Sequence, residues 1–267
     1  MTPLAVLAFS MGAKKLGDAM GMKYIIIFYS VLTTLCGILV FLKMDNEKIE
    51  AGEKVEFKDL KTVLKMPAVW IISIVTFCTY VFCLSLYYFI PYATSFLGAS
   101  VVFGATLAAL KRYVSPVSNI GGGFLSDKVG TSNLLLISFI IMGVGTALII
   151  LLPLNASMKA VFAFIYLVIY FFFNVNYALT WAMMEEGKIP VRVSGTAAGV
   201  ISTVGYLPEI FCSLLAGKLI DKYPGVTGYR YFFTFLIAMM ALGVVCVLVW
   251  KRSLEKNKES EKPSEAE

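Results

Sequence analysis

Residues 134–152 read LLLISFIIMGVGTALIILL, an apolar stretch without a single charged side chain. A helix needs about 20 such residues to cross the ~30 Å hydrocarbon core of a membrane. The apolar residues are continuous and do not alternate with polar ones, which excludes a strand of an outer-membrane barrel. The stretch therefore predicts a transmembrane helix at residues 133–153.

The same pattern recurs along the whole chain. Of its 267 residues, 59% are hydrophobic and only 15% are charged, and the mean hydropathy is +0.82. One soluble core cannot hold so many apolar side chains. The sequence therefore predicts an all-α integral membrane protein, a helical bundle with about seven transmembrane helices. The predicted spans are residues 24–43, 67–91, 99–120, 133–153, 159–182, 195–217 and 229–250.

The chain lacks one residue type, which argues against most membrane-embedded enzymes. The sequence contains no histidine, which removes zinc-protease signatures and the Ser-His and Cys-His nucleophilic pairs. The cysteines lie inside apolar stretches without a CxxC pair, so we expect small hydrophobic side chains rather than disulfides or metal ligands. They are Cys36, Cys78, Cys83, Cys212 and Cys246. We expect no catalytic residue, no metal and no cofactor.

Basic residues predict how the spans are oriented. If residue 43 ends a span on the cytoplasmic side, the segments on that side carry about twice as many lysines and arginines as the opposite segments. This predicts a multi-pass protein of the cell membrane with a cytoplasmic C-terminus. Residues 44–66 then form a charged cytoplasmic linker, in which Leu60, Val63 and Leu64 have the spacing of a short surface helix. Residues 253–267 are predicted to be a disordered tail.

Two stretches of the chain resemble one another, residues 12–43 and 217–251. Each places glycine, lysine, leucine and aspartate ahead of a span that begins near a tyrosine and ends at a lysine. We expect equivalent helices of two related halves. The matching residues are Gly12, Lys14, Leu16, Asp18, Tyr24 and Lys43 in the first stretch, and Gly217, Lys218, Leu219, Asp221, Tyr231 and Lys251 in the second.

Residues 123–130 read GFLSDKVG and lie between the third and fourth predicted spans. They resemble the G-x-L-x-D-[RK]-x-G loop of the major facilitator superfamily, which lies on the cytoplasmic side after the second helix of each half. This resemblance makes Gly123, Asp127, Lys128 and Gly130 a gating motif. An aspartate there can accept hydrogen bonds from a helix N-terminus. A further resemblance follows the fifth span, where Glu185, Glu186, Pro190 and Arg192 precede a small-residue helix start.

The resemblance implies a domain organisation. Residues 1–43 would be the tail of an N-terminal half, namely the end of its fifth helix and its sixth helix. Residues 67–252 would be the C-terminal six-helix half. The chain would then be truncated at its N-terminus and would lack most of a partner half. Major facilitator transporters bind their substrate near the middle of the membrane, between two such halves.

The resemblance also implies which spans line the cavity, namely residues 67–91 and 159–182. Aromatic rings and amides on these spans suit a polar organic solute, because they supply donors and stacking faces without a fixed charge. Interfacial tyrosines and helix packing are the alternative explanation for any one of them. The candidate substrate-binding residues are Tyr80, Tyr87, Tyr170, Asn174 and Asn176.

Three charged residues fall inside predicted spans. Lys111 and Arg112 lie roughly 18 Å along the third span, at about 1.5 Å per residue, and a cation there needs a partner or water. They are candidates for binding an anionic substrate, or for a structural pair with Glu209. Glu209 could instead take up a proton during coupling. Pro208 is expected to kink the helix beside it, and Gly195 and Gly199 are expected to pack closely against another helix.

These features predict a secondary active transporter, a symporter or permease that moves a small organic anion by alternating access. A proton or sodium ion would be the coupling partner, membrane lipid would surround the helices, and no nucleic acid is expected. Two alternatives stay open: a truncated half-transporter that does not transport, and a seven-helix receptor or sensor. An embedded enzyme is a more distant possibility, since serine and lysine would have to act without histidine.

Overall fold

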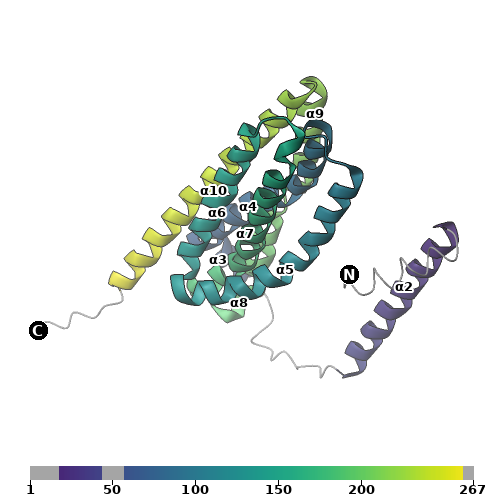
Figure 1. Ribbon diagram of the computed structural model, residues 1–267. Coiled ribbons are helices and arrows are strands. Elements are labelled where there is room, and N and C mark those ends of the chain that lie inside the picture. Colours follow the sequence, from purple (N-terminus) through teal and green to yellow (C-terminus); the bar gives the residue numbers. More distant parts are fainter. Residues whose placement is uncertain (1–17, 44–56, 261–267) are drawn as a thin grey trace, which may run out of the picture. The chain divides into compact units, whose positions relative to one another are not determined.

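A computed structural model describes residues 18–43 and 57–260 of the chain (Figure 1). This part is helical throughout and contains no strand, as the apolar spans predict. The helices are α2 (Asp18–Lys43), α3 (Phe57–Leu64), α4 (Pro67–Phe96), α5 (Val101–Val129), α6 (Thr131–Leu151), η1 (Ala156–Met158), α7 (Lys159–Glu186), α8 (Val191–Gly205), α9 (Pro208–Lys222) and α10 (Val226–Ser260).

Each predicted span has its counterpart among these helices. Six spanning segments in the described residues are long and apolar enough to cross a membrane, and one of them runs through α8 and α9. The remaining counterpart is α5, which is 29 residues long but carries Lys111, Arg112 and several serines. Its length suits a crossing, and its polar side chains explain its lower hydropathy.

The chain divides into two compact units, residues 1–54 and 55–267. In the first unit the described helix is α2, whose apolar side chains are exposed to the surroundings. The predicted repeat begins at residues 12–17, and the predicted linker is residues 44–66; residues 12–17 and 44–56 lie outside the described residues, and the rest of the linker contains α3. The second unit contains α3 to α10 and carries the candidate site.

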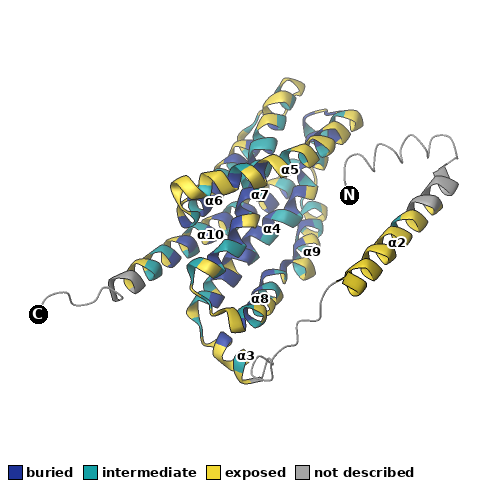
Figure 2. Cartoon of the chain, turned by 90° about the horizontal axis from the view of Figure 1, so that it is seen from below, coloured by how far each residue is buried: buried dark blue, intermediate teal, exposed yellow. Residues whose placement is uncertain are grey.

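Helix α4 is the central helix of the second unit, and it packs against α7, α8, α9 and α10. Burial along its length is high, as the dark α4 in Figure 2 shows. Near one end of α4, aromatic rings stack tightly: the centroids of Phe89 and Phe233 lie 4.7 Å apart and those of Tyr92 and Phe233 lie 5.3 Å apart. Aromatic contacts of this kind add to the energy of area burial.

Two glycines allow helices to approach closely. A Cβ on Gly205 of α8 would lie 2.5 Å from the Thr76 side chain of α4, and one on Gly122 of α5 would lie 3.0 Å from Val175 of α7. The close packing expected at Gly195 and Gly199 is not found, since a Cβ at either position would meet no described atom within 4 Å. The buried face of α8 instead carries Val193, Ala197, Ile201 and Gly205.

Two sequence predictions concern the ends of the second unit. The surface helix expected around Leu60 is confirmed as α3. At the other end of the chain, α10 continues to Ser260, so residues 253–260 are helical where a disordered tail was predicted. Leucine, glutamate and lysine in this segment are good helix formers, which explains the extension. Residues 261–267 lie outside the described part.

Candidate functional site

The helix predicted at residues 195–217 is interrupted in its middle. α8 ends at Gly205 and α9 begins at Pro208. Pro208 has no backbone N–H to donate to Val204, and the Leu207 N–H donates to the Val204 carbonyl instead, at 3.3 Å. The predicted disturbance at Pro208 is confirmed as a break at residues 206–207. In membrane proteins such breaks are tolerated where the backbone is buried in protein or lines a cavity.

A group of polar side chains meets at this break, and we call it the tyrosine–glutamate cluster: Tyr80, Tyr177, Tyr206 and Glu209. The Tyr80 hydroxyl donates a hydrogen bond to the Glu209 carboxylate at 2.8 Å. The rings of Tyr80 and Tyr206 lie 4.5 Å apart, and the hydroxyls of Tyr177 and Tyr206 are 3.4 Å apart. Helices α4, α7 and α9, together with the break between α8 and α9, thus contribute to one cluster.

An open pocket of about 410 Å³ lies over the break. Tyr206 and Glu209 line it together with hydroxyl and apolar side chains: Ser202, Thr203, Leu207 and Ile210. It offers one carboxylate and several hydroxyls without a basic side chain.

Lys111 of α5 meets the same face of α7 about 10 Å farther along the helix, because its contact Tyr170 precedes Tyr177 of the cluster by seven residues, or two turns. Its ammonium group is 5.1 Å from the centroid of the Tyr170 ring and 5.9 Å from that of Tyr166. Lys111 and Tyr170 are half-buried and Tyr166 is fully buried. Within the described residues, neither Lys111 nor its neighbour Arg112, which is exposed, has a carboxylate within ion-pair distance. Aromatic faces stabilise the ammonium group but do not neutralise its charge.

The two candidate asparagines of α7 point in different directions. The Ser115 hydroxyl of α5 donates to the Asn174 side chain at 2.9 Å, on the same helix interface as Lys111. Asn176 is fully buried and accepts a hydrogen bond from Thr79 of α4 at 2.7 Å. The structure therefore brings Lys111, Tyr170 and Asn174 together and places Asn176 in the α4–α7 interior.

Tyr87 is the most exposed of the candidate tyrosines, at 74%. It follows Tyr80 by seven residues, which places it on the same face of α4 about 10 Å farther along the helix. Tyr206 was not among the sequence candidates. Its position two residues before a proline inside an apolar span was the signal that could have identified it.

The predicted gating motif was expected as a loop, but residues 123–129 continue α5 and only Gly130 lies at the junction with α6. Gly130 ends α5 with a φ of +87°, a conformation that favours glycine. Asp127 and Lys128 are exposed, and the hydroxyls of Ser126 and Thr131 lie 3.1 Å apart across the junction. No hydrogen bond joins Asp127 to a helix N-terminus within the described residues, so the contact expected of Asp127 is absent from this part of the chain.

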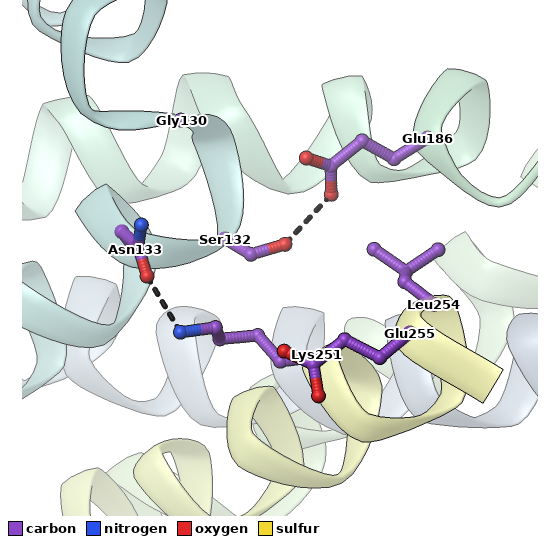
Figure 3. A pocket seen from close by; sticks show the side chains of 7 residues that line it. All are labelled: Gly130, Ser132, Asn133, Glu186, Lys251, Leu254 and Glu255. Atoms are coloured by element: carbon purple, nitrogen blue, oxygen red, sulfur yellow. Dashed lines mark hydrogen bonds between the residues drawn. The ribbon is translucent and has the colours of Figure 1, made fainter. Parts of the chain in front are cut away.

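A second polar group surrounds the same junction (Figure 3). The Glu186 carboxylate at the end of α7 accepts hydrogen bonds from the Ser132 hydroxyl at 2.8 Å and from the Trp250 indole N–H at 3.1 Å. Beside them, the Lys251 ammonium donates to Asn133 at 2.6 Å. These contacts tie α6, α7 and α10 together around a pocket of about 190 Å³. No group of three or more potential metal ligands occurs in the described residues.

Comparison with known proteins places these features in a family. The model of the Major Facilitator Superfamily matches residues 1–211. Two relatives come from Escherichia coli K12: the inner membrane protein YihN is 27% identical over 90% of this chain and 60% of its own length, and the inner membrane protein YqcE is 29% identical over 87% of this chain and 57% of its own length. The chain thus spans about 60% of the length of these curated relatives. The resemblance of residues 123–130, the helical bundle and the family match agree, and the chain belongs to the major facilitator superfamily.

Proposed function

We propose that this chain forms the C-terminal half, with the preceding helix, of a secondary active transporter that works by alternating access. Membership of a family of transporters supports this function, and so does the interrupted helix beside an open pocket, since broken helices in transporters accompany substrate and ion sites. The relatives' greater length supports the proposal that a further helical half takes part. We place the C-terminus on the cytoplasmic side.

The solute of this transporter is a small organic anion. The observation that carries this proposal is Lys111, a half-buried cation about 15 Å into α5 that has two tyrosine rings beside it and, among the residues that the structure describes, no carboxylate within ion-pair distance. A charge that remains unneutralised at this depth is costly unless water or an anion meets it. Tyr170 lies next to the same ammonium group, and Asn174 lies one turn farther along α7 at the same α5–α7 interface, so both can supply polar contacts for the remainder of a solute.

Glu209 is the proposed coupling residue. In its ionised form it accepts the hydrogen bond of Tyr80, which joins α4 to α9. Taking up a proton would remove the charge that strengthens this bond. Proton uptake would therefore weaken one link between the central helix and the interrupted one, and a sodium ion at the carboxylate would have a similar effect.

Uptake measurements test this function. Proteoliposomes containing the 267-residue chain, and the longer product if the reading frame continues upstream, are offered labelled carboxylates, phosphate esters and neutral sugars, with and without a proton gradient. We expect concentration-dependent uptake of an acid and none of the neutral solutes. Absence of acid uptake by every product that inserts normally would contradict the transporter function. Uptake of a neutral solute alone would contradict the proposed solute class.

A further inference from the structure

Helix α3 has a surface that the proposed transport function does not use. It ends directly ahead of α4, with the Lys65 and Met66 N–H groups completing its last turn and Pro67 beginning the spanning helix. Because α4 crosses the membrane, α3 must lie at the boundary between membrane and water. α3 is a strongly amphipathic helix of eight residues.

One side of α3 is already occupied by protein. Val63 is fully buried, and Asp59 forms a salt bridge with Arg192 at the start of α8, at 3.4 Å. The Trp70 indole N–H of α4 donates to the Leu64 carbonyl at the end of α3, at 2.9 Å. These contacts fix the rotation of α3 about its own axis, and so determine which residues face outward.

The outward surface has two parts. The first is apolar and consists of Leu60, Leu64 and Trp70, which are 36%, 41% and 43% exposed. The second is basic, with Lys61 and Lys65 exposed beside the leucines. At about 100° per residue Lys61 and Lys65 both lie on one side of the leucine strip, so a helix that places this strip at the headgroup level can extend both lysines to the phosphates. Figure 2 colours much of the α3 ribbon as exposed.

We propose that this surface, formed by Leu60, Lys61, Leu64, Lys65 and Trp70, binds the headgroups of anionic phospholipids. The leucines and the tryptophan enter the interface, where tryptophan is enriched in membrane proteins. The lysines meet the negative surface of the leaflet, which attracts basic segments adjoining a membrane helix. Docked in this way, α3 holds Arg192 and the start of α8 at a fixed depth. The inference depends on membrane insertion and not on transport.

Hydrogen exchange tests the proposal with the full chain in lipid nanodiscs. Exchange of residues 57–66 is compared in phosphatidylcholine discs and in discs that contain about one-third phosphatidylglycerol. We expect amide exchange in this segment to be at least about fivefold slower in the anionic discs. The Lys61→Gln/Lys65→Gln variant should lose the difference, because both side chains are exposed and their removal leaves the contacts of Val63 and Asp59 in place.

The matched control is Lys218→Gln/Lys222→Gln, which removes the same charge at the far end of α9. It should keep the lipid-dependent protection of residues 57–66. Raising the salt concentration should reduce this protection in the unmodified chain, which tests the electrostatic part without any substitution. Equal exchange in the two lipids would overturn the proposal and indicate that another part of the protein covers α3. Equal loss in both lysine variants would also overturn it, since bulk charge would then be the cause.

Discussion

Tyr80 of α4 and Glu209 of α9 are joined by a hydrogen bond of 2.8 Å, although they are 129 positions apart in the sequence. Glu209 lies in the first turn of α9, directly after the break, where the partial positive charge of a helix N-terminus favours a carboxylate. The bond therefore fastens the interrupted helix to the central one at the point where it can bend. It also places the acid at the pocket formed by Ser202, Thr203 and Tyr206.

A double-mutant cycle should measure this link. Tyr80→Phe removes the donor and Glu209→Ala removes the acceptor, whereas Glu209→Gln keeps an acceptor oxygen and loses the charge. We expect a coupling free energy of about 1–3 kcal/mol between Tyr80→Phe and Glu209→Ala in unfolding of the detergent-solubilised chain, because the acceptor is ionised. Coupling with Glu209→Gln should be smaller. Strictly additive effects of Tyr80→Phe and Glu209→Ala would show that the bond contributes nothing to stability.

The close approach of α4 and α8 provides a second test. Gly205→Ala places a methyl group 2.5 Å from the Thr76 side chain, and such overpacking typically costs about 1–3 kcal/mol. Gly199→Ala in the same helix meets open space among the described residues, so it should raise stability by up to ~1 kcal/mol through its better helix propensity. Thermal unfolding of the two variants should therefore shift in opposite directions. A similar shift for both would mean that α4 and α8 do not touch at Gly205.

The sequence predicted the membrane class and the helix positions because both depend on local composition. Residues 134–152 must lie in a helix within a membrane whatever their neighbours are, and Pro208 disturbs a helix by its own covalent structure. The partners of Glu209 could not be predicted in the same way. Lys111 and Tyr80 were both available inside spans, and only the packing of α4 against α8 and α9 brings Tyr80 to the carboxylate.

The same reasoning explains the misassigned glycines. Gly195 and Gly199 have the small-residue spacing typical of a helix interface, but spacing alone does not reveal which face of α8 meets α4. The face that does so carries Gly205. Asn174 and Asn176 likewise differ by two positions, about 200° around α7, so one reaches Ser115 and the other Thr79. Their separation follows from geometry once the neighbours of α7 are known.

Membrane topology should follow the charge distribution. Single cysteines at Lys65 and Lys128, in a cysteine-free background, should react with a membrane-impermeant maleimide from one side of sealed vesicles. Cysteines at Ser95 and Asn155 should react only from the other side. Ser95 lies at the opposite end of α4 from Lys65, and Asn155 follows α6 at the opposite end from Lys128. We expect the side of Lys65 to be cytoplasmic. Labelling of Lys65 and Asn155 variants from the same side would contradict the seven-span arrangement.

The aspartate of the gating motif should affect turnover more than affinity. Asp127 is exposed and has no hydrogen-bond partner in the described residues, so its role would lie in one conformational state of the transporting protein. Asp127→Asn should lower the maximal rate of solute uptake several-fold and leave the half-saturating concentration within about twofold. Asp221→Asn serves as the control and should transport normally. Asp221 lies near the end of α9, which is the C-terminal end of the span formed by α8 and α9. A normal rate for Asp127→Asn at normal membrane levels would remove Asp127 from the mechanism.

Lys111 should determine the preference for an anionic solute. Its ammonium group is half-buried over Tyr170 and Tyr166, while the exposed Arg112 points to another face of α5, about 100° away. Lys111→Gln keeps most of the side-chain length and the ability to donate hydrogen bonds but removes the charge, which should weaken binding of a carboxylate or phosphate solute by about tenfold or more, equivalent to ~1.5–3 kcal/mol. Lys111→Arg should retain most of the affinity, and Arg112→Gln and Lys218→Gln should change it by less than about threefold. Equilibrium binding to the variants in nanodiscs measures this without requiring turnover. If Lys111→Gln binds anions as tightly as the unmodified chain, the ammonium group serves only the packing of α5 against α7, and the solute must be recognised elsewhere.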